Sequence, residues 1–145
     1  MLMKKILLAE DNPFDLELTL AGLAENRLTN EVVVARDGAE ALDYLKRRGR
    51  FADRTPGSPM VILLDLKMPK MDGLEVLRQI KSDPALHTIP IVVLTSSREE
   101  QDVVESYNLG VNAYVVKPVA FDKFVDVVKQ IGLFWVLTNE VPARM

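Results

Sequence analysis

The sequence predicts an α/β fold in which five parallel strands form one sheet with helices on both faces. Five short apolar runs, rich in β-branched residues, are continuous rather than alternating, as expected of strands that are buried on both faces. The runs are Ile6–Ala9, Val32–Ala35, Val61–Leu64, Ile91–Leu94 and Ala113–Val116. Segments with helical spacing of apolar residues lie between them. Strands that alternate with helices in this way favour a doubly wound parallel sheet.

Each segment between the strands has the apolar spacing of an amphipathic helix. The predicted helices lie around residues 16–23, 41–45, 74–80, 103–107 and 121–131. Asn12 followed by Pro13 is typical of a helix N-cap and first helical residue. Asp72, with Glu75 three residues later, has the spacing of a capping box. The connection from residue 48 to residue 59 contains two prolines and two glycines and is predicted to be a surface loop.

The composition is that of an ordinary folded protein, and it excludes several classes of function. The chain has 145 residues, of which 48% are hydrophobic, and its net charge is −3, so we expect no basic nucleic-acid-binding surface. It has no cysteine and one histidine, His87, which excludes disulfides and thiolate or multi-histidine metal sites. Every apolar run is shorter than the roughly 18 residues that span a bilayer. We therefore expect a cytoplasmic protein that binds neither membrane nor nucleic acid directly.

Polar groups suited to one small site follow four of the five predicted strands. Glu10 and Asp11 follow the first apolar run, Asp65 the third, Thr95 the fourth and Lys117 the fifth. In an open α/β sheet, ligands bind beyond the carboxyl ends of the strands, where the strand order reverses. The second run contributes no such group, which fits the order 2-1-3-4-5, because the second strand is then an edge away from the crevice.

These groups fit the chemistry of metal-assisted phosphoryl transfer. Glu10, Asp11 and Asp65 bring three negative charges together and Lys117 brings one positive charge, so a divalent cation would neutralise the set. Carboxylate oxygens with water in the remaining positions suit Mg²⁺. A phosphoryl group beside Asp65 would also meet the Lys117 ammonium and the Thr95 hydroxyl, which offset charge on its oxygens. Asp65 follows the central strand and is the best candidate for a carboxylate nucleophile.

Each of these residues alone has a more ordinary interpretation. An acidic residue at a strand end is most often a turn former or a helix cap, an isolated threonine is more often a cap, and an isolated lysine is more often a solvated charge. Their joint placement at four strand ends favours a functional site over these separate structural roles.

Four motifs together resemble the receiver domain of bacterial response regulators. They are Glu10-Asp11-Asn12, the segment 63–73, Leu94-Thr95-Ser96 and Lys117-Pro118. The resemblance covers residues 4 to about 133 and implies a flavodoxin-like (βα)5 fold, with the strand order of which the receiver CheY is an established example. It implies a two-component response regulator whose partner is a sensor histidine kinase.

The resemblance also implies how the metal and the phosphoryl group are held. Asp65 would accept the phosphoryl group. Asp11 and Asp65 would ligate Mg²⁺ directly, together with the backbone carbonyl of Lys67, and Glu10 would act through a metal-bound water. Lys117 would bind the phosphoryl group.

A second set of residues is implied to form the conformational switch. Thr95 would shift toward the phosphoryl group, and Tyr114 would swing inward behind it. Ser96 is small and leaves room for access to the acceptor. For Tyr114 the residues alone leave two interpretations open, because a core aromatic residue with its hydroxyl at the surface fits equally well.

The C-terminal segment continues to be apolar beyond what the last predicted helix needs. Phe134, Trp135 and Leu137 either fold back on the domain or form a surface that pairs with a second copy, and we expect a homodimer. The predicted organisation is a receiver domain over residues 1–134 and an extension over 135–145, with no separate output domain. This ending and the loop from 48 to 59 also resemble the single-domain regulators that partner bacterial phytochrome kinases.

Other classes of function fit the motifs less well. A phosphatase of the haloacid dehalogenase type needs a second aspartate two residues after the nucleophile, where this chain has Lys67. A nucleotide-binding module needs a glycine-rich phosphate loop, which the chain lacks. We therefore expect a signalling domain rather than an enzyme that acts on other substrates. A receiver-like binding module that works without phosphorylation remains an alternative.

Overall fold

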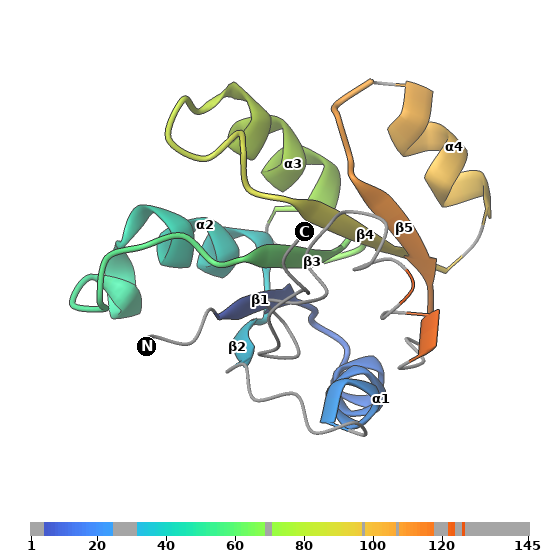
Figure 1. The fold of residues 1–145 in the computed structure, drawn as a ribbon, viewed down its shortest axis with the longest axis horizontal. Helices are drawn as coiled ribbons and strands as arrows, with labels where there is room; N and C mark the ends of the chain where they lie inside the picture. Colours follow the sequence, from blue (N-terminus) through green and yellow to red (C-terminus); the bar gives the residue numbers. More distant parts are fainter. Residues whose placement is uncertain are drawn as a thin grey trace, which may run out of the picture.

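Five parallel strands form a single sheet in the order β2-β1-β3-β4-β5 (Figure 1). The structure is a computed structural model that describes residues 5–24, 32–68, 71–96, 98–106, 108–117, 122–123 and 126. The strands are β1 (Ile6–Ala9), β2 (Val32–Ala35), β3 (Val61–Asp65), β4 (Ile91–Thr95) and β5 (Ala113–Val116). The predicted strand order is confirmed, and β3 and β4 each extend by one residue to include Asp65 and Thr95.

A helix connects each strand of this sheet to the next one along the chain. The helices are α1 (Pro13–Ala24), α2 (Gly38–Lys46), α3 (Gly73–Ser82) and α4 (Arg98–Ser106). Figure 1 shows α2 and α3 on one side of the sheet and α1 on the other. The fifth predicted helix, around residues 121–131, lies largely outside the described residues. Within the part of the chain that the structure describes, no helix has the length and apolar character needed to cross a membrane.

Successive residues of each strand pack on opposite faces of the sheet, which produces two apolar cores. In β1, Leu7 and Ala9 pack toward α2 and α3, whereas Ile6 and Leu8 pack toward α1. The same period of two residues holds in β3 and β4. Because both faces of the central strands are covered, every residue of β1, β3 and β4 is buried.

Side-chain caps fix where the helices begin. Asn12 Oδ1 accepts hydrogen bonds from the backbone N–H groups of Phe14 (2.9 Å) and Asp15 (3.0 Å), which confirms the predicted N-cap of α1. Asp72 Oδ1 accepts from the N–H of Glu75 at 2.9 Å and caps α3. Both capped helices begin close to the carboxyl ends of β1 and β3, so the caps position the loops around the site described below.

The loop from 48 to 59 lies at the surface, as predicted, and aromatic and cationic side chains attach it to α2. Its first turn is a short 3-10 helix, η1 (Gly49–Phe51). The Arg54 guanidinium lies 4.1 Å from the centre of the Tyr44 ring, and its Nε donates to the Tyr44 carbonyl at 2.7 Å. The rings of Tyr44 and Phe51 meet edge to face at 5.1 Å. These contacts restrain the loop on the face of α2.

Candidate functional site

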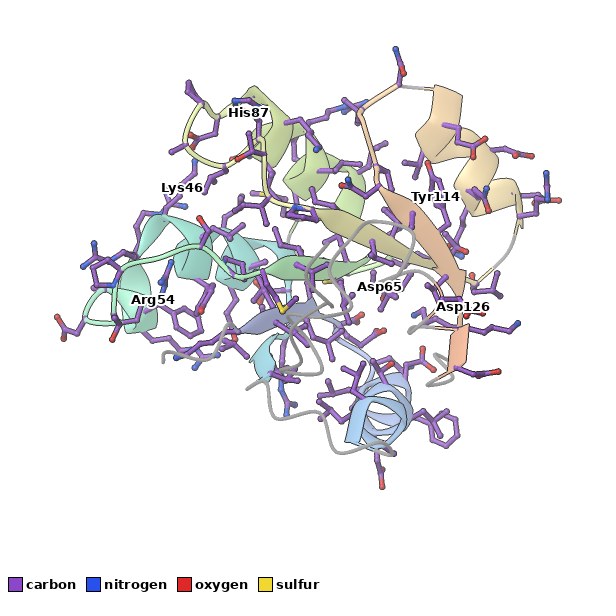
Figure 2. All side chains as sticks on the ribbon, viewed as in Figure 1. Lys46, Arg54, Asp65, His87, Tyr114 and Asp126 are labelled. Atoms are coloured by element: carbon purple, nitrogen blue, oxygen red, sulfur yellow. The ribbon has the colours of Figure 1, made fainter. Side chains whose placement is uncertain are left out.

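The carboxylates of Glu10, Asp11 and Asp65 meet at the carboxyl edge of the sheet. Ala9 of β1 pairs with Leu64 of β3, so the next residues along the two strands lie level with each other. One oxygen from each of the three carboxylates lies within 4.8 Å of the others. Figure 2 labels Asp65 at this end of β3. Glu10 is fully buried and Asp65 is 2% exposed, so two of these negative charges are removed from water.

The ammonium group of Lys117 lies among these carboxylates. Its Nζ is 3.1 Å from Glu10 Oε1, 3.2 Å from Asp65 Oδ1 and 3.1 Å from Asp15 Oδ2, which is in the first turn of α1. The backbone N–H of Lys117 donates to the Thr95 carbonyl at 2.8 Å, and this hydrogen bond holds the backbone of Lys117 beside the end of β4. The Lys117 side chain is only 13% exposed and pairs with three acidic groups, from the residue after β1, from α1 and from the end of β3.

The crowding of like charges changes the proton affinity of the site. Burial, the hydrogen bond with Asp65 and the Asp65 charge together raise the pKa of Glu10 from 4.5 to about 7, although the Lys117 charge and its hydrogen bond act in the opposite direction. Burial lowers the pKa of Lys117, but the charges of Asp65 and Glu10 and the hydrogen bond to Asp15 outweigh it, so that this pKa is raised. The site therefore favours added positive charge.

Thr95 and Ser96 follow each other at the end of β4 and differ in their contacts. Thr95 is fully buried, and its Oγ1 has no hydrogen-bond partner among the residues that the structure describes. The backbone N–H and the Oγ of Ser96 both donate to the Glu100 carboxylate, at 3.1 and 2.5 Å. A buried hydroxyl without a partner costs free energy, so Thr95 is available to a group that enters the site.

Lys67, in the loop that follows β3, and Gly73, the first residue of α3, both lie beside Asp65. The N–H of Lys67 donates to Asp65 Oδ1 at 3.4 Å, and its ammonium pairs with Glu100 at 3.1 Å. A Cβ on Gly73 would lie 2.3 Å from the carbonyl oxygen of Asp65 and 2.6 Å from the Cα of Leu66. Only glycine lets the start of α3 approach the backbone of Asp65 this closely.

The donor set fits a hard divalent cation. Glu10, Asp11 and Asp65 offer only carboxylate oxygens, the ligands that Mg²⁺, Mn²⁺ and Ca²⁺ prefer over softer metals. Two of these carboxylates are buried, and Lys117 supplies a single compensating charge, so a cation would relieve their repulsion.

Comparison with known proteins agrees with this geometry. The family model of the response regulator receiver domain matches residues 6–129 of the chain. The chain belongs to this family. It is a two-component response regulator, and receiver domains bind a divalent metal.

Proteins similar to this chain include regulators of phytochrome signalling. Response regulator Rcp1 of Synechocystis sp. is 41% identical over 140 residues, which cover 97% of this chain and 94% of Rcp1. The structure of the bacteriophytochrome response regulator AtBRR is 59% identical, with a TM-score of 0.91, and the match covers 97% of this chain and 100% of that one.

Two further solved structures are those of a phosphorylated and a metal-bound regulator. The phosphorylated cyanobacterial phytochrome response regulator RcpA is 45% identical with a TM-score of 0.75, over 98% of this chain and 100% of RcpA. The Mn²⁺-bound form of Rcp1 is 41% identical with a TM-score of 0.73, over 97% of this chain and 99% of that one.

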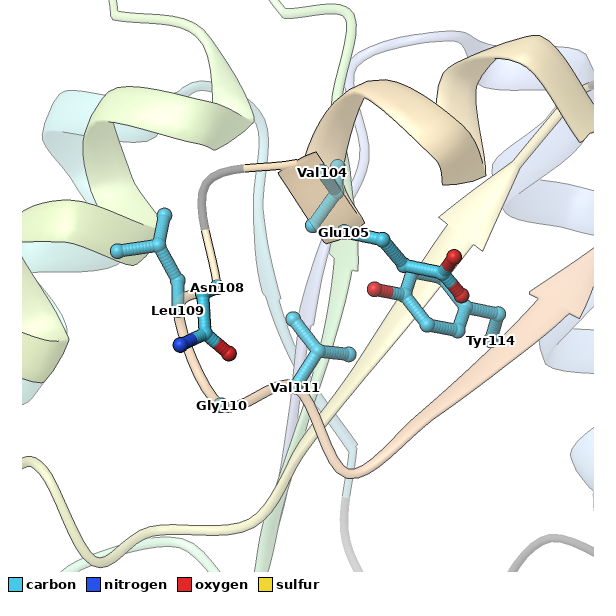
Figure 3. A pocket seen from close by; sticks show the side chains of 7 residues that line it. All are labelled: Val104, Glu105, Asn108, Leu109, Gly110, Val111 and Tyr114. Carbon is cyan, nitrogen blue, oxygen red and sulfur yellow. The ribbon is translucent and has the colours of Figure 1, made fainter.

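Tyr114 of this receiver domain is half-buried at the side of the sheet near α4. It lines a cavity of about 320 Å³ together with residues from the end of α4 and the loop before β5 (Figure 3). Burial raises the pKa of its phenol, and the charge of Glu105 raises it further. The phenol ring also packs against the core beneath α2 and α3. The position fits both interpretations that the sequence left open.

Asp15 belongs to the receiver site although the sequence analysis did not predict it. Asp15 contacts Lys117 across 102 positions of the chain. A weak signal was present, because Asp15 is an acidic residue in the first turn of the helix that begins directly after Glu10 and Asp11. The structure brings together the predicted Glu10, Asp11, Asp65 and Lys117. Phe134, Trp135 and Leu137 lie outside the described residues.

Proposed function

We propose that Asp65 accepts a phosphoryl group from a phosphohistidine of a sensor kinase. The observation that carries this proposal is the contact of the nearly buried Asp65 carboxylate with Lys117, at 3.2 Å, beside two further carboxylates. An Asp65 oxygen attacks phosphorus, the new O–P bond forms, the P–N bond to the histidine breaks, and the imidazole keeps the electron pair and takes up a proton.

Mg²⁺ is the cation that this receiver uses. Asp11, Asp65 and the backbone carbonyl of Lys67 would hold it directly, and Glu10 would act through a metal-bound water. When bound, the cation offsets negative charge on the phosphoryl oxygens. The Mn²⁺-bound form of a 41% identical regulator and the all-oxygen donor set support a divalent ion at this position.

The chain's own residues then orient the phosphoryl group and respond to it. The Lys117 ammonium binds one phosphoryl oxygen, and the Thr95 hydroxyl, which has no hydrogen-bond partner among the described residues, donates to another. Thr95 moves toward the phosphoryl group when it makes this bond, and Tyr114 turns inward behind it. Ser96 is small and keeps the approach to Asp65 open. The switch is thus a local change of charge that alters the surface around β4, α4 and β5.

The resemblance to phytochrome regulators supports a proposal for the kinase partner and for the cellular location. The kinase is of the phytochrome type, and phosphotransfer takes place in the cytoplasm, where ATP supplies the kinase. The protein is a phosphoacceptor that assists only its own phosphorylation and dephosphorylation, and it binds neither nucleic acid nor membrane directly. Residues 1–134 form the receiver domain and residues 135–145 form an extension.

The C-terminal segment pairs with a second copy of the chain. Its apolar residues, Phe134, Trp135 and Leu137, supply the contact surface. Sedimentation at micromolar concentration, with and without residues 134–145, tests this homodimer. A dimer that becomes a monomer on truncation supports it, and a monomer in both cases refutes it.

Intact mass after incubation with acetyl phosphate tests the phosphoacceptor. We expect a Mg²⁺-dependent gain of one phosphoryl group in the wild-type protein and in Asp53→Asn, a matched change at an exposed loop aspartate. The nearly isosteric Asp65→Asn variant should fold and gain nothing. Phosphoryl on folded Asp65→Asn would refute the assignment. A folded wild-type protein that binds Mg²⁺ but accepts from neither acetyl phosphate nor a phytochrome-type kinase would favour a binding module that works without phosphorylation.

A further inference from the structure

Lys117 has one partner that does not belong to the acidic cluster around the acceptor. Its Nζ lies 3.1 Å from Asp15 Oδ2, as close as it lies to Glu10 and closer than it lies to Asp65. Glu10 and Asp65 are members of the group of carboxylates that suits a metal ion, whereas Asp15 is not. Asp15 therefore contacts Lys117 from α1 and is not one of the carboxylates that would bind a cation.

The position of Asp15 is fixed by the start of its helix. Its backbone N–H donates to the side chain of Asn12 at 3.0 Å, and it is the third residue of α1. A carboxylate in the first turn interacts favourably with the helix dipole, so the negative charge is well placed there. The Asp15 side chain is 30% exposed, against 13% for Lys117. Asp15 is thus a restrained and partly hydrated anion that reaches a more deeply placed ammonium.

The contact between Asp15 and Lys117 becomes more important when a cation and a phosphoryl group occupy the site. A bound cation would compete with Lys117 for the oxygens of Glu10 and Asp65, and phosphorylation would convert the Asp65 carboxylate into an acyl phosphate, which is no longer a carboxylate anion. An ammonium shielded from water must keep a partner, because an unpaired buried charge is costly. The lysine stem is also flexible, so it needs an anchor to hold the ammonium in one place. Asp15 is the partner that the metal and the phosphoryl group leave in position.

We propose that Asp15 is a positioning residue for phosphotransfer, which holds the Lys117 ammonium beside the acceptor while the other partners of the lysine turn to the metal and the phosphoryl group. The proposal rests on the proposed phosphorylation of Asp65. It also connects the acceptor to the first turn of α1 through one ion pair.

The rate constant for phosphorylation by acetyl phosphate tests this role. We expect Asp15→Ala to lower it about tenfold. Asp15→Asn keeps an oxygen that can accept from the ammonium and should recover most of the loss. Glu17→Ala removes an exposed carboxylate from the same helix and should leave the rate unchanged. Equal rates in Asp15→Ala and wild type would overturn the proposal, and so would equal acceleration in Asp15→Ala and Asp15→Asn, which indicates charge repulsion alone.

A second readout needs neither metal nor phosphoryl group. Reductive methylation of the metal-free protein, followed by peptide mass spectrometry, reports how freely Lys117 reacts relative to the exposed Lys46. We expect this ratio to rise about threefold in Asp15→Ala and less in Asp15→Asn, because a lost ion pair lowers the proton affinity of the amine. An unchanged ratio would overturn the proposal. Phosphorylation of Asp65 in the wild-type protein serves as the separate check on the proposed function.

Discussion

The Lys67 ammonium lies 3.1 Å from the Glu100 carboxylate, and this ion pair joins the loop after the acceptor strand to the first turn of α4. The same carboxylate accepts from the backbone N–H and the hydroxyl of Ser96. Glu100 is therefore attached to both loops that border Asp65. The Lys67 side chain is 79% exposed and the Glu100 side chain only 14%, so the lysine end of the ion pair lies in water and the carboxylate end is largely buried.

We expect Glu100→Gln to lower the free energy of unfolding by about 1 kcal/mol, because the two Ser96 hydrogen bonds to the Glu100 carboxylate are charge-assisted. Lys67→Gln should change it by less than about 0.5 kcal/mol, because an exposed ion pair contributes little. Urea denaturation of the two variants measures both values. Equal losses in the two variants would contradict this division of the network.

The raised pKa of Glu10 predicts an unusual pH dependence of stability in the metal-free protein. Between about pH 5 and pH 7 the folded protein keeps a proton on Glu10 that the unfolded chain has released, so raising the pH favours unfolding. The rise of this pKa from 4.5 to about 7 corresponds to roughly 3 kcal/mol at most. Asp65 and Lys117 face Glu10, and the raised pKa of Lys117 keeps the lysine charged throughout this range.

Urea titrations of the metal-free protein from about pH 5 to about pH 8 measure this effect. We expect the free energy of unfolding to fall with rising pH in the wild-type protein. Added Mg²⁺ should restore it at the upper end, because the ion binds the deprotonated carboxylate. Glu10→Gln removes the titrating group and should flatten the profile. The same slope in Glu10→Gln and wild type would assign the effect to another group.

The strands and the site were largely predictable because both depend on local pattern. Continuous apolar runs are buried on both faces, and the residue after each run reaches the carboxyl edge of the sheet, as Asp65 and Lys117 do. Asp15 was not predicted, because its contact with Lys117 joins residues 102 positions apart, and no spacing in the sequence encodes that contact. The attachment of Arg54 to Tyr44 was missed for the same reason, since a loop rich in proline and glycine carries no pattern for a stacked cation.

The close approach of α3 to the acceptor makes Gly73 a sensitive position. A Cβ there would meet backbone atoms at 2.3 and 2.6 Å, and backbone cannot move aside as a flexible side chain can. We expect Gly73→Ala to destabilise the fold by about 3 kcal/mol and to weaken Mg²⁺ binding through displacement of Asp65. Ser82→Ala, at the exposed end of the same helix, is the matched control. Thermal unfolding and calorimetric titration measure the two effects, and wild-type stability in Gly73→Ala would contradict the predicted clash.

Removal of the Lys117 ammonium should separate metal binding from phosphotransfer. Lys117→Ala leaves Glu10, Asp15 and Asp65 without the cation that they share, so we expect a loss of about 3 kcal/mol in the metal-free protein near pH 8. The more negative site should bind Mg²⁺ at least as tightly as the wild type. The phosphorylation rate should nevertheless fall roughly 100-fold, because the phosphoryl oxygens lose a fixed positive charge.

Calorimetry with Mg²⁺ and the rate of mass gain from acetyl phosphate measure the two quantities in Lys117→Ala. Lys46→Ala removes an exposed lysine at the end of α2 and should match the wild type in both. The metal and the lysine both offset negative charge on the phosphoryl group. A variant that binds Mg²⁺ normally and still loses phosphotransfer would therefore show that Mg²⁺ alone is insufficient for phosphotransfer. Wild-type phosphorylation by a folded Lys117→Ala variant would instead place the required positive charge elsewhere.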